Sequence, residues 1–227
     1  MKKSKFKLFA ALLLAAAMTV LSLSGAAPVL ADETAAILAN AAKSPAVHTA
    51  PEGYDQNDFN KVRTFLEQTD SNGIRNGEKL NPDGYDPDDP ESWGALFVDE
   101  WGFEHEAYFD WEEVDGINRM FAINLTYIRD FAGPFDMSGL DALSTLDVDG
   151  GNFTTADLSN CYEMTHCYFA NSTLSSVNFF NCANVTELYL QDNELTEVLN
   201  LGDCTSLLFL DILMNLSLIH ISEPTRQ

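Results

Sequence analysis

Seven side chains with the chemistry of a binding surface occur at matching positions of a repeated segment in the second half of the chain. They are Asp147, His166, Tyr168, Glu187, Tyr189, Phe209 and Asp211. Each alternates with apolar residues, so in a strand it would point away from the core that those residues form. Tyrosine rings offer rigid amphipathic contact area, and charged neighbours add specificity, which favours recognition of a protein or a sugar. The simpler explanation is that tyrosine favours strands.

Catalysis is not predicted from these residues. The sequence contains no G-x-S-x-G, H-E-x-x-H, phosphate-loop or dinucleotide-binding motif. His48 lies in an alanine-rich stretch, His105 stands between two glutamates, and His166 is the only histidine in its segment. Carboxylates are too numerous for one pair to be singled out as general acid and base. We therefore predict that the chain is not an enzyme, and that it has no catalytic residue and no cofactor.

Two acidic stretches raise the question of calcium. The carboxylates within residues 83–91 are the hard oxygen ligands that Ca²⁺ prefers, but their spacing is not that of an EF-hand. Asp70-Ser-Asn72-Gly73 begins like such a loop, yet Ile74 stands where an oxygen ligand is due. The alternative is a solvated acidic turn. Calcium therefore stays a hypothesis, and we assign no metal ligand; no Cys/His spacing suggests zinc.

An apolar pattern that recurs every 21 or 22 residues positions the seven side chains. Its segments begin at Leu143, Met164, Val185 and Leu207, and each has further apolar residues three and five positions later. A second apolar series runs in phase with the first. Its members are Phe153, Ala156, Leu158 and Cys161, then Leu174, Val177, Phe179 and Cys182, then Leu195, Val198, Leu201 and Cys204. A coil this short cannot bury its apolar side alone, so the pattern predicts a stacked solenoid.

The pattern resembles L-x-x-L-x-L-x-x-N-x-L of leucine-rich-repeat proteins. Asn193 and Asn215 match its asparagine, whereas Gly151 and Ser172 replace it in the earlier coils. The repeat length and the Asn/Asp-Cys pairs are most similar to internalin-like surface proteins of Gram-positive bacteria. The resemblance covers roughly residues 117–215. It implies an α/β fold leaning to β: a leucine-rich-repeat solenoid with short parallel strands, a mixed N-terminal cap, a truncated carboxyl end and a concave binding face.

A degenerate first coil is predicted ahead of these repeats, with Met120, Ile123 and Leu125 in the strand positions. Before it, residues 51–116 form an acidic region that resembles the segment preceding such repeats. A helix is predicted over Gln56–Gln68, capped by Asp55 or Asn57. Its apolar face would cover the open first coil and contains Phe59, Val62, Phe65 and Leu66.

Between this helix and the repeats, the spacing predicts a loop and two strands. The run from Asp70 to Pro90 is rich in Gly, Pro, Asn and Asp, and it predicts an extended loop. The aromatic segments Trp93 to Trp101 and Ala107 to Trp111 are strand candidates that would complete the cap.

Four cysteines in an exported chain ordinarily suggest two disulfides. Here Cys161, Cys182 and Cys204 fall at one equivalent position of successive coils, and Cys167 replaces a strand leucine. We therefore expect reduced thiols packed as small apolar groups. Adjacent strands lie about 4.8 Å apart, within reach of a disulfide, so geometry leaves a bridge open.

The two ends are predicted to lie outside the fold. Residues 1–31 have a lysine-rich start and a short apolar run broken by Ser, Gly and Pro, which favours a signal peptide over a membrane anchor. Residues 32–50 read as a tether. Residues 216–227 resemble one reading frame of a transposase adapter used in DNA sequencing libraries, so we expect an artefact there and a longer natural protein.

The formal net charge of −23 excludes a basic stripe for nucleic acid. We predict an exported bacterial protein, secreted or at the cell surface, that is not inserted in the membrane after signal cleavage. Its repeats would bind a protein or a surface glycan through the concave strand face. The alternative is a non-catalytic repeat module of a larger surface protein whose enzyme or wall-anchoring domain is missing.

Overall fold

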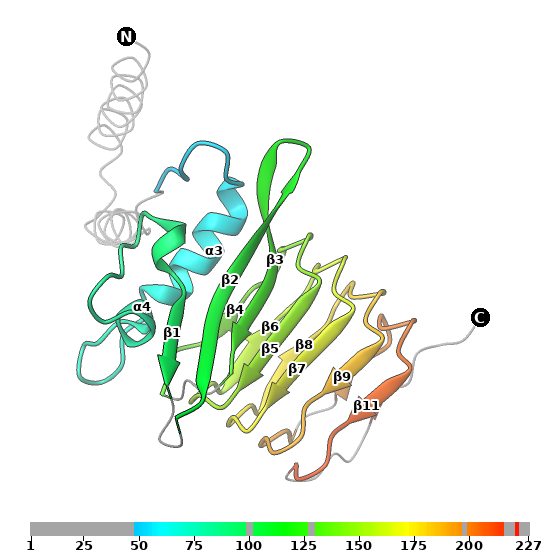
Figure 1. The fold of residues 1–227 in the computed structure, drawn as a ribbon. Helices are drawn as coiled ribbons and strands as arrows, with labels where there is room; N and C mark the ends of the chain where they lie inside the picture. Colours follow the sequence, from blue (N-terminus) through cyan, green and yellow to red (C-terminus); the bar gives the residue numbers. More distant parts are fainter. Residues whose placement is uncertain (1–47, 99–101, 127–129, 197–198, 216–220, 223–227) are drawn as a thin grey trace, which may run out of the picture. The chain divides into compact units, whose positions relative to one another are not determined.

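The described part of the chain folds as a parallel-strand solenoid of about four turns with few helices (Figure 1). The computed structural model describes residues 48–98, 102–126, 130–196, 199–215 and 221–222. The predicted signal peptide, most of the tether and most of the adapter-like segment lie outside these residues. A mostly β fold agrees with the prediction of an α/β fold leaning to β.

One sheet of seven strands carries the first apolar series. Its order is β1 (Ala95–Val98), β2 (Glu104–Val114), β3 (Ile117–Leu125), β5 (Thr145–Asp149), β7 (His166–Ala170), β9 (Glu187–Tyr189) and β11 (Phe209–Asp211). Pairing is antiparallel from β1 to β3 and parallel from β3 to β11. Leu146, Cys167, Leu188 and Leu210 are direct neighbours on adjacent strands. The predicted register of the repeats is therefore confirmed.

The second apolar series lies on and directly beside shorter strands. β4 (Phe135–Asp136), β6 (Thr155–Asp157) and β8 (Ser176–Asn178) form a parallel sheet, and β10 (Leu199–Asn200) pairs in parallel with β12 (Ile221–Ser222). β12 thus places two residues of the adapter-like segment beside β10. In the last coil Leu199 is buried, and the expected Val198 lies outside the described residues.

Apolar side chains from both series form one continuous core. Ile123 and Leu125 of β3 pair with Leu146 and Val148 of β5, and Met120 is also fully buried, which confirms the first coil. Phe153 lies at the centre of a group of rings. Its ring centroid is 5.3 to 6.0 Å from those of Phe65, Phe131, Phe135 and Phe169.

All four cysteines are buried and free, as predicted. The thiols of Cys161 and Cys182 donate to main-chain carbonyls of the preceding coil, at 3.3 and 3.1 Å from sulfur to oxygen. Burial raises the pKa of Cys182 to about 11 and that of Cys204 to about 12. Burial likewise holds the pKa of Cys167 well above its ordinary value. The thiols therefore stay protonated at neutral pH.

The predicted helix is present as α3 (Gln56–Leu66), two residues shorter than expected at its end. The Asp55 carboxylate accepts bonds from the amides of the first turn, and the four apolar residues predicted for the inner face are buried. Phe65 contacts Phe135 and Phe153 of the first coils, with ring centroids 5.4 and 6.0 Å apart. The helix therefore packs against the apolar end of the solenoid.

The prediction of an extended loop between Asp70 and Pro90 is wrong in part. A short helix, α4 (Asn76–Leu80), forms there, and a 3-10 turn, η1 (Pro90–Ser92), follows. The Glu78 carboxylate caps the first turn of α4 by accepting from the Arg75 N–H at 3.0 Å, and the buried Asn76 side chain fixes its position. Its amide donates to the carbonyls of Phe65 and Ala132 and accepts from the Ala132 N–H, so it ties the segment to the core. β1 forms within the first strand candidate, of which residues 99–101 lie outside the described part of the chain, and β2 contains the second candidate and extends beyond it at both ends.

Polar side chains bridge consecutive coils at the position predicted for asparagine. The Asn193 amide donates to the carbonyls of Phe169 and Leu190 at 2.8 and 3.2 Å, and its oxygen accepts from the Leu174 N–H at 3.2 Å. Asn215 makes the equivalent bonds one coil later. In the coil before, the Ser172 hydroxyl donates to the Gly150 carbonyl at 2.7 Å.

Replacing Asn193 with alanine is expected to lower the free energy of unfolding by roughly 2–4 kcal/mol, because buried main-chain groups lose their partners. Urea denaturation would measure the change. Asn215→Ala removes the same bonds from a half-buried position, so a smaller loss is expected there. If both variants lower the free energy of unfolding equally, burial does not determine how much these bonds stabilise the fold.

Candidate functional site

All seven predicted binding residues lie on one face of the seven-stranded sheet, in two neighbouring rows. One row runs Asp147, Tyr168, Tyr189, Asp211, and the other runs Thr145, His166, Glu187, Phe209. We call the seven residues, without Thr145, the tyrosine face. The structure therefore brings together side chains that are up to 64 positions apart in the sequence.

Alternation along the strands produces this face. Leu146, Cys167 and Leu188 are fully buried, whereas the residues on either side of each are half-buried or exposed. The alternation fails at Ala170, which it would place on the outer face but which is fully buried. A single methyl group projects too little to reach past its longer neighbours.

Tyr189 is the centre of an aromatic strip that crosses β7, β9 and β11. Its ring centroid is 4.9 Å from that of Phe209, 5.8 Å from that of Tyr168 and 5.6 Å from that of His166. The Tyr189 hydroxyl donates to Glu187 at 3.2 Å. Desolvation, followed by the Glu187 carboxylate, raises the pKa of Tyr189, so its hydroxyl remains a donor. Such a strip offers rigid contact area with polar edges.

His166 connects three strands through two carboxylates. Its Nε2 atom is 3.4 Å from Asp147 on β5, and its Nδ1 atom is 3.5 Å from Glu187 on β9. Both are ion pairs only when the imidazole is protonated. Burial raises the pKa of the Asp147 carboxyl, although His166 lowers it in part. The imidazole therefore lies between acidic groups that hold its ring beside the tyrosines.

The tyrosines are surrounded by negative charge. Desolvation raises the pKa of Tyr168, and four carboxylates raise it further. These belong to Asp149, Asp192, Asp147 and Asp211. A phenol in this field is harder to ionise because a second negative charge would be repelled. The face therefore combines apolar rings with an acidic surround.

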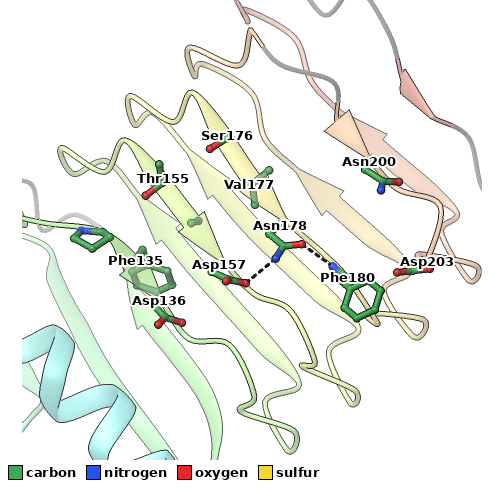
Figure 2. A pocket seen from close by; sticks show the side chains of 12 residues that line it. Phe135, Asp136, Thr155, Asp157, Ser176, Val177, Asn178, Phe180, Asn200 and Asp203 are labelled. Carbon is green, nitrogen blue, oxygen red and sulfur yellow. Dashed lines mark hydrogen bonds between the residues drawn. The ribbon is translucent and has the colours of Figure 1, made fainter. Parts of the chain in front are cut away.

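A pocket of about 430 Å³ lies against the other sheet, and sequence reasoning missed it (Figure 2). Its lining includes Asp136, Asp157, Asn178 and Asn200, together with the exposed ring of Phe180. The four polar residues recur at intervals of 21 or 22, so the repeat spacing could have revealed them.

The polar side-chain atoms of this pocket already form hydrogen bonds that stabilise turns. Asp157 Oδ1 accepts from Asn178 Nδ2 at 3.1 Å and from the Ser159 N–H at 3.0 Å, and Asn178 Oδ1 accepts from the Phe180 N–H at 3.1 Å (Figure 2). Asn200 repeats this bond with the N–H of the second following residue. These side chains serve the fold, so the pocket is a weaker candidate than the tyrosine face.

The acidic stretches considered for calcium use several oxygens in their own turns. Asp86 accepts from the Asp88 N–H at 2.9 Å, and Asp89 accepts from the Glu91 N–H at 3.1 Å. Asp70 forms an ion pair with the nearby Lys79 amine at 2.9 Å. Within the described residues, no group of three or more His, Cys, Asp or Glu side chains is arranged to hold a metal ion. Calcium binding therefore stays a hypothesis.

Comparisons with protein-family models, with curated proteins and with solved structures found no match. Among the helices of the described ranges, none is long and apolar enough to cross a membrane. What the chain does is therefore inferred from the geometry of the tyrosine face.

Proposed function

We propose that this chain is an exported bacterial leucine-rich-repeat protein that binds a protein or a surface glycan through the tyrosine face, and that it is not an enzyme. The observation that carries the proposal is the register that aligns Tyr168 with Tyr189 and places Asp147 and Asp211 at the two ends of their row. In a leucine-rich-repeat solenoid this face would be the concave one.

The coil-to-coil bridges support the leucine-rich-repeat assignment. Asn193 and Asn215 occupy the asparagine position of the repeat and bond to the main chain of the preceding coil. We assign α3, α4 and strands β1 and β2 to the N-terminal cap of such a protein. A cap is needed because an open first coil would expose apolar core and an unpaired strand edge.

Rigidity supports the binding role of the face. The Tyr189 ring contacts the rings of Tyr168 and Phe209 on the neighbouring hydrogen-bonded strands, so little side-chain freedom remains to be lost when a ligand binds. The ring of Phe209 is 46% exposed although it is apolar. A strand preference alone would explain each aromatic residue but not their arrangement in one connected strip.

Replacing Tyr189 with alanine is expected to weaken binding by about 30-fold or more, the effect of a central aromatic anchor. Arrays of immobilised surface proteins and of glycans would first be probed with the full chain. The dissociation constant of each captured molecule would then be measured by surface plasmon resonance, for the chain and for the variant.

Phe180→Ala is the matched control, because this exposed ring lies by the pocket of the opposite sheet. It should leave the dissociation constant unchanged. Circular dichroism should be the same for both variants, since neither ring is in the core. Binding that survives Tyr189→Ala, or that falls equally in Phe180→Ala, would overturn the proposal.

A further inference from the structure

The negative charge of the tyrosine face indicates which kind of partner it can bind. No lysine or arginine occurs from Asp130 to Asn215, the stretch that contains strands β4 to β11. On the sheet itself, carboxylates of Asp147, Glu187 and Asp211 flank the aromatic strip. Among the seven residues of the tyrosine face, His166 is the one basic group, and two carboxylates already contact it. A partner that buries this face must bring positive charge to offset it.

The sheet geometry sets the spacing of that positive charge. Asp147 on β5 and Asp211 on β11 occupy one row with three strand intervals between them. At about 4.8 Å per interval, the two positions are about 14 Å apart. An extended peptide rises about 3.4 Å per residue, so it covers this distance in about four residues. Residues i, i+2 and i+4 of such a peptide point to the same side.

We propose that the tyrosine face binds an extended basic segment of a partner protein that lies across strands β5, β7, β9 and β11. This rests on the proposed function and names its ligand class. A lysine or arginine at position i pairs with Asp147, and a second one at i+4 pairs with Asp211. The residue at i+2 packs on the rings of Tyr168 and Tyr189.

The tyrosine rings add to the attraction for such a segment. The methylene stem of a lysine or arginine packs on an aromatic ring while its charged end reaches a carboxylate. Cations are also drawn to the faces of tyrosine rings. A neutral glycan could stack on the same strip, but it would leave the carboxylates without a counter-charge. The acidic surround therefore favours a basic peptide over a glycan.

Fluorescence anisotropy with the full chain tests the proposal. The probe is a labelled peptide with lysines at positions i and i+4, leucine at i+2 and threonines between them. Acetylating both lysines should weaken binding at least tenfold, and so should moving the second lysine to i+3, which turns it away from the face. Raising the ionic strength should weaken the binding of the unmodified peptide.

The double variant Asp147→Asn/Asp211→Asn should also bind the peptide at least tenfold more weakly. Glu163→Gln/Glu194→Gln is its matched control, because it removes the same charge from two exposed residues outside the tyrosine face. Equal weakening in both pairs, or peptide binding that ignores acetylation and lysine spacing, would overturn the basic-segment proposal.

The two proposals fail in different ways. If Tyr189→Ala abolishes capture on the arrays while the peptide does not bind, the face is a binding site but its ligand is not a basic segment. Capture of neutral glycans alone leads to the same conclusion. If capture is independent of Tyr189→Ala, the tyrosine face itself is not the site.

Discussion

Replacing Arg119 with methionine is expected to lower the free energy of unfolding by about 3–5 kcal/mol, because it leaves a buried carboxylate without its counter-charge. Asp58 on α3 is fully buried. Its two oxygens lie 2.8 and 3.4 Å from Nε and Nη2 of Arg119 on β3, and one of them accepts from the Met120 N–H at 3.1 Å. Arg119 also contacts Asp141 in the next coil. The guanidinium thus joins the helix, the hairpin strand and the first repeat.

Lys61→Met is the control for this result. Lys61 pairs with Asp136 at 2.7 Å, but both groups are partly open to solvent, so the pair should contribute at most about 1 kcal/mol. Urea denaturation followed by tryptophan fluorescence would measure both variants, since Trp93 is buried beside α3. Similar losses in the two variants would show that the Asp58 pair does not hold the helix on the repeats.

Replacing Phe153 with alanine is expected to lower the free energy of unfolding by about 3–5 kcal/mol, through lost burial and the cavity that remains. The ring of Phe153 is fully buried and contacts rings from α3, from β4 and from β7. The backbone also packs closely against this ring. A Cβ added at Gly151, whose φ is 101°, would lie 2.6 Å from the Phe153 ring.

Chemical denaturation of Phe153→Ala and Phe153→Leu would give the size of this effect. The leucine variant should lose clearly less, because it refills much of the space. Phe180→Ala removes an equal number of atoms from an exposed ring and should cost less than about 0.5 kcal/mol. If Phe153→Ala lowers the free energy of unfolding by less than about 1 kcal/mol, the ring cluster does not hold α3 against the coils.

The repeat spacing was sufficient to predict the stacked strands and the members of the tyrosine face. A period of 21 or 22 fixes which residues become neighbours, and alternation decides which side chains point out. Both rules act along the chain, so one sequence is enough to apply them. The packing of α3 was predictable for the same reason, since its apolar face follows the helical period.

Features that depend on contacts distant in sequence were not predictable in this way. Asn76 sits among turn-forming residues, and its bonds to Phe65 and Ala132, which tie α4 to the core, join residues 11 and 56 positions apart. The contacts within the tyrosine face also needed coordinates. Spacing puts His166 beside Glu187, but it does not say that the imidazole reaches Asp147 as well.

Two further features of the sequence correspond to local backbone conformations. Asp115-Gly116 has φ angles of 53° and 82° and joins β2 to β3 as a tight hairpin, a turn that Asp-Gly between two strands favours. A left-handed residue also follows each strand of the repeats, at Gly150, Asn171, Asp192 and Met214. The first three are residue types that tolerate this conformation, and Met214 is the exception.

Labelling of the buried thiols would measure how often individual coils of the solenoid open. Alkylation requires attack by a thiolate on the reagent, and these sulfur atoms are both inaccessible and protonated in the closed state. Labelling must therefore wait for a coil to separate from its neighbours. Cys161, Cys182 and Cys204 belong to successive coils. The order in which they are modified would therefore show at which end of the solenoid unfolding begins.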